Sequence, residues 1–374
     1  MLLSTRRNIA IDATPLLYVS NGIGRSTRAL VNELLSVDRG VDFTLFGRRL
    51  GGGRLRDQKL SARNVHLRLP RLAEPAIQKL GLFERRCAAD LYHATDFYSP
   101  LRNPQRAIST IHDVIFLKNP EPIVDHERLA KWAGPFARSC RAVITCSNWC
   151  RKEISETLEI DSERIHVTYW GIDRDLFRPE FDADALRQRL QASFGIRRPY
   201  FLAVSCSTGR KNTPRLLRAF ESLIAQGLDH DLILVWTAPP EIQQSHTNSI
   251  ERGRLRFTGR VSDESLRDLY CGATAVLYPS LDEGFGLPIV EAMSCGAPVI
   301  TSNTTCLPEI AGNACLLVNP MEEADIAGAI SKLANDAVEA DRLKQLGLAR
   351  SQDFSWRRCA EQTLAVYQRA LETN

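Results

Sequence analysis

Short apolar runs alternate with amphipathic segments along almost the whole chain. The apolar runs predict strands at residues 8–13, 41–46, 65–69, 91–93, 107–112, 142–146, 165–169, 200–205, 232–236, 255–258, 275–278, 299–301 and 316–318. Helical patterns separate several of them, at 26–35, 148–158, 213–226 and 265–271. Such alternation is typical of parallel sheets that are covered by helices on both faces.

The strands form two arrays, one in each half of the chain, and a polar stretch from about 171 to 199 lies between them. A chain of 374 residues is long for one hydrophobic core. We therefore expect an α/β protein with two doubly wound, Rossmann-like domains. Ligands bind beyond the carboxyl ends of such strands, so two sheets facing each other would line a cleft.

The composition, 44% hydrophobic and 25% charged, is that of a soluble globular protein. No apolar run approaches the roughly 18 residues that a membrane-spanning helix needs. Arg6 and Arg7 interrupt the apolar start of the chain, which lacks the core of a signal peptide. A cytoplasmic location is the expectation.

The chain has ten cysteines, and only Cys146 and Cys150 have a spacing that suggests a metal site. No second pair and no nearby histidine completes that site. We expect reduced thiols in the core and no bound metal.

Residues 48–86 are strongly basic, with eleven Lys or Arg against three Asp or Glu, and leucines are interleaved with the charges. Two interpretations stay open: a solvated face, or contact with anionic membrane lipid or a lipid diphosphate. Nucleic acid is disfavoured, because the segment has neither a known binding motif nor interleaved aromatic residues.

Two loops that follow strands carry candidate chemistry. Gly22-Ile23-Gly24 follows the first strand, but without the third glycine or a ribose-binding acid it does not favour a nicotinamide dinucleotide; a flexible loop near a phosphate or sugar remains possible. Arg210 and Lys211 stand at the entrance of a helix and suit a diphosphate, or else form a solvated basic turn. His112 ends an apolar strand and is either structural or functional.

The stretch DEGFGLPIVEAMSCGAPVI, residues 282–300, places Glu283 and Glu291 on either side of a glycine-rich turn. Pro288 suits the first position of a helix, and Gly296 suits its end. A helix over 288–295 would direct free amides toward an oxyanion, and Gly286 would let a ligand approach the backbone. The alternative is a tight turn with Glu291 merely favourable in the first helical turn.

Together these loops resemble the retaining glycosyltransferases of family 4 (group 1), which have the GT-B fold, over nearly the whole chain. The matching stretches are E-x7-E at 283–291, Tyr-Pro-Ser at 278–280, GAPVI at 296–300, Arg-Lys-Asn at 210–212, Gly-Ile-Gly at 22–24, His-Asp at 112–113 and Phe-Ser-Trp at 354–356. The resemblance implies an N-terminal acceptor domain (1–172), a donor domain (173–353, with a linker at 173–199) and a final helix (354–374) that crosses back.

The family assigns roles to the matching residues. Glu291 would bind the ribose hydroxyls, Glu283 and His112 would position the transferred sugar, and Arg210 and Lys211 would neutralise the diphosphate. The other residues implied in donor binding are Gly22, Gly24, Phe285, Gly286 and Leu287. The family implies front-face displacement with retention, and neither a metal nor a cofactor besides the nucleotide sugar. Asp182-Ala183-Asp184, which mimics a metal-binding motif, is interpreted as a helix start.

Residues 258–263 could determine the choice of donor. There Val261 and Asp263 would contact the base, and the Asp263 carboxylate could accept hydrogen bonds from both guanine N–H groups. Equally, Ser262 could cap a helix that begins at Asp263. The resemblance is closest to bacterial GDP-mannose-dependent α-mannosyltransferases of O-antigen and exopolysaccharide assembly. It implies a polyprenyl-diphosphate-linked or other lipid-linked glycan acceptor at the inner membrane surface, faced by segment 48–86. The chain departs from the family pattern at Trp170, where many members have asparagine.

Three alternatives stay open. The donor could be a UDP- or dTDP-sugar such as dTDP-rhamnose. The chain could be a sugar-nucleotide epimerase or a phosphorylase, although no cofactor lysine is placed for the latter. It could also be a non-catalytic scaffold subunit of a polysaccharide assembly complex, although such a protein would be expected to lose motif residues that are present here.

Overall fold

A computed structural model describes residues 6–17, 22–37, 40–48, 63–67, 74–118, 126–207 and 209–372. The chain divides into two compact units: Met1–Gly171 together with Trp356–Asn374, and Ile172–Ser355. The boundaries expected from the sequence, after residues 172 and 353, lie within a few residues of these.

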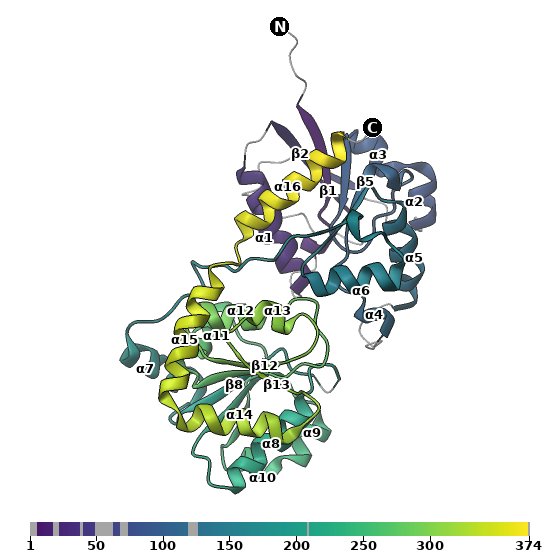
Figure 1. Cartoon of the computed structure of the whole chain (residues 1–374). Helices are drawn as coiled ribbons and strands as arrows, with labels where there is room; N and C mark the ends of the chain where they lie inside the picture. The colour runs from purple at the N-terminus through teal and green to yellow at the C-terminus, as the bar shows by residue number, and fades with distance from the viewer. Residues whose placement is uncertain are drawn as a thin grey trace. The chain divides into compact units, whose positions relative to one another are not determined.

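The first unit is built on one parallel sheet of seven strands in the order β3-β2-β1-β4-β5-β6-β7 (Figure 1). Its strands are β1 (Arg7–Asp12), β2 (Val41–Arg48), β3 (Arg63–Leu67), β4 (Leu91–Ala94), β5 (Ala107–Thr110), β6 (Ala142–Thr145) and β7 (Ile165–Val167). The chain runs outward from β1 to β3 and then returns to place β4 on the other side of β1. The loops after β1 and β4 therefore diverge at a topological switch point, where α/β proteins bind ligands.

Helices cover both faces of this sheet. They are α1 (Gly22–Ser36), α2 (Glu74–Leu80), α3 (Leu82–Cys87), α4 (Ile115–Lys118), α5 (His126–Ser139), α6 (Asn148–Leu158) and α16 (Trp356–Glu372), with short 3-10 turns η1 (Thr14–Leu17), η2 (Pro104–Arg106) and η3 (Ser162–Arg164). The C-terminal helix α16 lies beside α1 (Figure 1). Its Tyr367 packs into the same core as Ile9 and Val31, and its hydroxyl lies 2.6 Å from Nδ1 of the buried His93.

The second unit repeats this plan with six parallel strands in the order β10-β9-β8-β11-β12-β13. Its strands are β8 (Tyr200–Val204), β9 (Asp231–Val235), β10 (Leu255–Phe257), β11 (Ala275–Tyr278), β12 (Val299–Ser302) and β13 (Leu316–Val318). Its helices are α7 (Ala183–Phe194), α8 (Thr213–Ala225), α9 (Pro240–Ser245), α10 (Thr247–Glu251), α11 (Asp263–Gly272), α12 (Leu287–Ser294), α13 (Leu307–Ala311), α14 (Glu323–Asn335) and α15 (Ala337–Ser351). Here the switch point lies between β8 and β11.

Each of the thirteen predicted strands is present, but the expected glycine loop is not where the sequence placed it. Gly22 and Gly24 lie in the first turn of α1, so the prediction that they form a loop before a helix at 26–35 is wrong. Glycine is a poorer helix former than alanine, which has a cost in helix stability. Burial of Val31 and Leu34 on the same helix outweighs that cost. Ser20 and Asn21, which precede the helix, lie outside the described residues.

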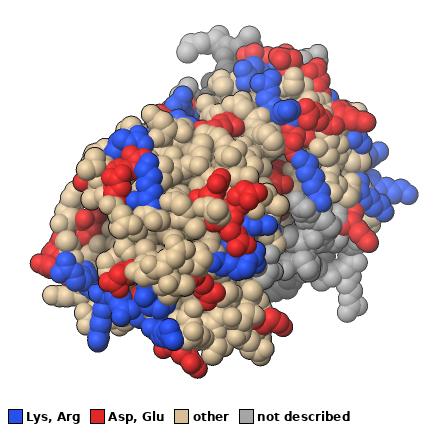
Figure 2. Space-filling model, turned by 60° about the horizontal axis from the view of Figure 1, so that its bottom comes forward, with Lys and Arg blue, Asp and Glu red and all other residues tan. Residues whose placement is uncertain are grey.

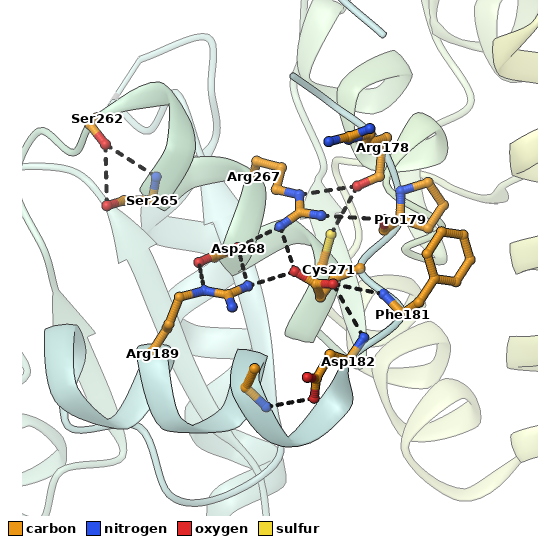
Figure 3. Close-up of polar contacts among 12 residues, drawn as sticks. Arg178, Pro179, Phe181, Asp182, Arg189, Ser262, Ser265, Arg267, Asp268 and Cys271 are labelled. Carbon is orange, nitrogen blue, oxygen red and sulfur yellow. Dashed lines mark hydrogen bonds and ion pairs between the residues drawn. The ribbon is translucent and has the colours of Figure 1, made fainter. Parts of the chain in front are cut away.

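The linker between the units is fastened to the second unit by an ion-pair network (Figure 3). Arg189 donates to Asp268 at 2.7 Å and to Glu180 at 2.8 Å, and Arg267 bonds both carboxylates as well. Asp182 accepts a hydrogen bond from the amide of Ala185 at 2.9 Å and so caps α7. The prediction that the Asp182-Ala183-Asp184 motif starts a helix is confirmed.

About half of the strongly basic segment 48–86, at residues 49–62 and 68–73, lies outside the described residues, so its role stays a prediction. On the face drawn in Figure 2, basic and acidic side chains lie interspersed over much of the described surface. Within the described part of the chain, no helix is long and apolar enough to cross a membrane. All ten cysteines are free thiols, and eight of them are buried.

Candidate active site

The switch point of the second unit brings two sequence-distant loops together. One follows β8 and carries Arg210, and the other follows β11. The Leu281 amide donates to the Arg210 carbonyl at 2.7 Å, and the Ser280 hydroxyl oxygen lies 3.0 Å from the same carbonyl oxygen. Strand order thus joins residues about seventy positions apart, because β8 and β11 are neighbours in the sheet.

Glu283 is the centre of this site and is 7% exposed. Arg210 Nη1 lies 2.9 Å from one carboxylate oxygen, and Lys211 Nζ lies 2.5 Å from the other. The hydroxyls of Tyr278 and Ser280 donate to that second oxygen at 2.9 and 2.6 Å. Burial alone would raise the pKa of Glu283, but the charges of Lys211 and Arg210 hold it at about 2. The carboxylate is therefore ionised at neutral pH.

Lys211 is held from a second side by Tyr278. Its ammonium donates to the Tyr278 hydroxyl at 2.6 Å and lies 4.8 Å from the centre of the ring. Burial lowers the pKa of Lys211, and the Glu283 carboxylate opposes that effect. Two cations face one carboxylate, so the cluster keeps an excess positive charge that suits a diphosphate. The alternative of a solvated basic turn is wrong for Lys211, whose side chain is only 13% exposed.

Asn212 holds the Arg210–Lys211 loop in place. Its backbone is left-handed, with φ of 60°, and its buried side-chain amide donates to the carbonyls of Pro279 at 3.0 Å and Pro320 at 2.7 Å. Asparagine tolerates this conformation better than most residues. Asn212, Tyr278 and Ser280 could not be given roles from the sequence, although all three belong to the stretches that carry the family resemblance.

Helix α12 begins one residue before its predicted start, at Leu287, with Pro288 in its first turn. Gly286 precedes it with φ of 87°, and an added Cβ would lie 2.8 Å from a methyl group of Leu307. Only glycine fits there. No side chain caps this helix start. Phe285 is buried and packs edge-to-face against Phe354, with ring centroids 5.7 Å apart.

Glu291 lies in the second turn of α12 and is 5% exposed. The Tyr270 hydroxyl, from α11, donates to its Oε2 at 2.9 Å. Burial and the Glu291 carboxylate both raise the pKa of Tyr270, which therefore stays a hydrogen-bond donor. The alternative of a carboxylate merely favourable in the first helical turn is wrong. Burial of a carboxylate costs free energy, and a ligand that donates hydrogen bonds to Glu291 would offset part of that cost.

The stretch proposed to choose the base contains a helix cap. Ser262 Oγ accepts a hydrogen bond from the Ser265 amide at 3.2 Å, and Asp263 is the first residue of α11. The capping interpretation is confirmed. Asp263 is also exposed. A contact of Asp263 or Val261 with a nucleobase stays a prediction.

The remaining predicted residues belong to the first unit. His112 follows β5 and is 5% exposed. Its Nε2–H donates to the Thr95 carbonyl at 3.0 Å, and among the described residues nothing bonds its Nδ1. Burial lowers the pKa of His112 to about 4, so the ring is neutral and Nδ1 carries a lone pair. The Trp170 ring packs edge-on against the His112 ring, with centroids 5.4 Å apart. The residue that departs from the family pattern therefore lies beside His112.

The structure thus gathers Arg210, Lys211 and Glu283 into one cluster and places Glu291 on the helix that leaves the same loop. Gly22, Gly24 and His112 lie in the other unit. In the ranges that the structure describes, no group of three or more His, Cys, Asp or Glu side chains is placed to hold a metal ion. Polar groups that surround an ionised carboxylate and two cations are typical of a site for an anionic, hydroxyl-bearing ligand.

Comparison with known proteins identifies the class and then the family. Residues 198–336 match the model of glycosyl transferases group 1, and residues 20–176 match that of glycosyltransferase family 4. The O-antigen chain mannosyltransferase B of Escherichia coli is 33% identical over 285 residues, which are 74% of this chain and 74% of that protein. The chain is therefore a glycosyltransferase. It belongs to group 1, family 4.

Other relatives are matched over a smaller share of their length. The serotype-specific mannosyltransferase WbdA of E. coli is 28% identical over 72% of this chain, which spans about a third (34%) of that protein. Solved structures share the whole fold, which is GT-B. A sucrose-phosphate synthase from Thermosynechococcus elongatus has a TM-score of 0.77 at 20% identity, over 99% of this chain and 100% of its own. HepE of Anabaena, in complex with UDP and glucose, has a TM-score of 0.74 at 17% identity, over 97% of this chain and 99% of its own.

Proposed function

We propose that the protein transfers an α-mannosyl group, with retention of configuration, from GDP-mannose to a lipid-linked glycan of a cell-surface polysaccharide. The single observation that carries the proposal is the cluster of Arg210, Lys211 and Glu283 at the switch point. It is a preorganised positive site, as a departing diphosphate requires. The choice of mannose is supported by relatives that are named as O-antigen mannosyltransferases.

In the proposed reaction, the acceptor hydroxyl oxygen bonds to the anomeric carbon of mannose. The bond from that carbon to the β-phosphate oxygen breaks, and GDP leaves with the electron pair. The proton of the hydroxyl passes to the departing phosphate oxygen. This front-face displacement requires no protein nucleophile and no metal, and it depends on positioning and on neutralisation of the leaving group.

Each residue of the site has a part in this reaction. Arg210 and Lys211 neutralise the diphosphate together with the amides at the start of α12. Glu291 accepts hydrogen bonds from the ribose diol, and its partner Tyr270 holds the carboxylate in position. Glu283 keeps both cations in place and contacts hydroxyls of the transferred sugar. His112 offers the lone pair of Nδ1 to another sugar hydroxyl.

The acceptor belongs to the proposal as well. A glycan on a polyprenyl diphosphate is held at a membrane, so we place the protein in the cytoplasm, associated with the inner membrane surface through segment 48–86. The positive charge of that segment would favour anionic lipid.

Calorimetric titration of the purified chain with GDP, UDP, ADP and dTDP, in the presence of EDTA, tests the donor. Selective binding of GDP that is lost in Glu291→Ala is the expected result. Selective binding of UDP or dTDP would keep the reaction and overturn GDP-mannose as donor. Binding of no nucleotide would favour a scaffold role. Proton NMR of the product made from GDP-mannose reports the anomeric configuration, and a β-linked product would overturn retention.

A further inference from the structure

The loop after β4, residues 95–101, is held in an unusual conformation at the switch point of the first unit. Phe97 is left-handed, with φ of 58°, a conformation that is strained for a residue of this size. The Phe97 amide donates to the Thr110 carbonyl at 2.9 Å, and the Ser109 hydroxyl donates to the Phe97 carbonyl at 2.6 Å. Hydrogen bonds to strand β5 thus hold Phe97 in a conformation that the loop would not adopt alone.

Strand β1 fixes the loop from the other side through Asp12. The Thr95 hydroxyl donates to the Asp12 carbonyl at 2.6 Å, and the Ser99 hydroxyl donates to Asp12 Oδ2. Asp12 Oδ1 accepts from the amide and the hydroxyl of Thr14. Both oxygens of the Asp12 carboxylate are therefore occupied by partners within the protein.

Asp96 lies in the same loop and has no such partners. It is partly buried, and no side chain or amide of the described residues donates a hydrogen bond to its carboxylate. Burial, aided by the nearby Asp12, raises the pKa of Asp96 to about 6, and Arg128 of α5 opposes the rise. A carboxylate that the protein neither pairs nor solvates fully has a cost in stability.

Tyr98, two residues after Asp96 in the loop, forms an aromatic pair with Trp132 of α5. Tyr98 and Trp132 stack with ring centroids 6.2 Å apart and an interplanar angle of 20°, and both are partly exposed. Arg128 Nε donates to the Tyr98 hydroxyl at 2.6 Å. The charged groups that act on Asp96 are thus Asp12 on β1 and Arg128 on α5.

We propose that Asp96 accepts hydrogen bonds from the hydroxyls of the acceptor sugar, with the Tyr98–Trp132 pair beside its carbon face. An ionised carboxylate only accepts, so its complement is a donor, and a vicinal diol supplies two. The two carboxylates of Asp96 and Asp12 disfavour a phosphate at this loop. A neutral polyol with one apolar face is the class of ligand that fits the three features together. This inference rests on the proposed function, because it assigns the acceptor to a particular loop.

Asp96→Asn tests the proposal. It keeps the shape of the side chain and replaces a carboxylate, which only accepts hydrogen bonds, by an amide, which both donates and accepts them. Asp161→Asn, at an exposed turn of the same unit, is the matched control because asparagine caps as aspartate does. The probe is octyl α-D-mannopyranoside, used as acceptor with GDP-mannose in kinetics and as ligand in saturation-transfer NMR with GDP present. Asp96→Asn should raise the KM for the glycoside at least tenfold, with the Kd for GDP unchanged within twofold. An unchanged KM, or no glycoside signal from the wild type, overturns the inference.

Two further readouts separate binding from a structural role. The KM of the wild type for the glycoside should fall as the pH rises through about 6, where Asp96 ionises, and the KM of Asp96→Asn should stay level. A raised pKa also means that Asp96 destabilises the fold once it is ionised, so the Tm of Asp96→Asn at pH 7.5 should equal or exceed that of the wild type. A lower Tm would make Asp96 a structural residue and overturn the proposal. Loss of GDP binding by the wild type would instead reject the proposed function.

Discussion

The two sheets share one plan of parallel strands, but the polar groups at their two switch points are arranged in opposite ways. At β8 and β11 both cations of the Glu283 cluster already contact one carboxylate, which also accepts hydrogen bonds from two hydroxyls. In the first unit the loops after β4 and β5 carry acceptors without partners among the described residues, Asp96 and Nδ1 of His112. The first arrangement suits an anion that competes for the cations, and the second suits hydroxyls that fill vacant acceptors.

The difference shows how a site can be prepared without its ligand. Cations that are left bare would be solvated and mobile, so a carboxylate that holds them fixes the geometry in advance. Neutral hydroxyls bind weakly, so an acceptor that awaits them must not be satisfied by the protein itself. Four predictions test this contrast.

Lys211→Ala should have the largest effect. It removes one leaving-group cation and leaves Glu283 with a single ion pair, so we expect kcat for mannosyl transfer to fall about 10²–10³-fold. Arg218→Ala is the matched control, because Arg218 pairs with Glu323 at the exposed surface of the same unit, where such a pair contributes little. Initial rates with GDP-mannose measure both. A Lys211→Ala enzyme within threefold of the wild type would remove the cluster from catalysis.

Glu291→Gln should act on the nucleotide rather than on the transfer step. Loss of the ribose-accepting carboxylate should weaken GDP binding about 10–100-fold, a loss of roughly 1.4–2.7 kcal/mol. The wild type should discriminate strongly against 2′,3′-dideoxy-GDP, and the variant should discriminate little. Calorimetry with both nucleotides gives the four affinities. Equal discrimination by the two proteins would show that the ribose is bound elsewhere.

The two switch points should lose stability at different pH values. Burial holds the pKa of His112 at about 4 and that of His93 at about 3, below the value of 6.5 in the unfolded chain. In this range the unfolded state binds more protons, so this stability is full above pH 6.5 and is lost as the pH falls toward 4. The pKa of Glu283 is lowered to about 2, so the stability that this carboxylate contributes is lost only as the pH falls from 4.5 toward 2.

Hydrogen exchange with mass spectrometry between pH 7 and pH 4 can follow this order, once rates are corrected for intrinsic exchange. Peptides of β4 and β5 should lose protection before peptides of β8 and β11. His112→Gln, which keeps a polar side chain and does not titrate, should reduce the acid sensitivity of the first unit. Simultaneous loss in both units would contradict the assignment of that sensitivity to the buried histidines.

Tyr278→Phe should have the smallest effect of the four. The hydroxyl bridges Lys211 and Glu283, which retain their direct contact without it, so we expect kcat to fall about fivefold, or roughly 1 kcal/mol. Steady-state kinetics measures it, and Tyr278→Leu, which also removes the ring beneath Lys211, should lower kcat further. Equal rates for the two variants would make the ring irrelevant.

Much of this site could be predicted from the chain alone. The spacing of Glu283 and Glu291, Pro288 and the glycines predicted the loop and helix α12 within one residue at each end. Arg210 and Lys211 could be singled out by charge at a helix entrance. The glycines at 22 and 24 were misplaced because the burial of the α1 face, which outweighs their low helix propensity, depends on the assembled sheet.

The sequence by itself determined the strands, several of the helices, the two parallel sheets and the residue types of the site, because those follow from periodicity and local backbone preferences. Only the tertiary structure decided that Lys211 meets Glu283, that Tyr270 holds Glu291 and that Asp96 has no donor. These pairings depend on strand order and on the depth of burial. Neither is a local property, since the packing of the whole sheet selects which distant loops become neighbours.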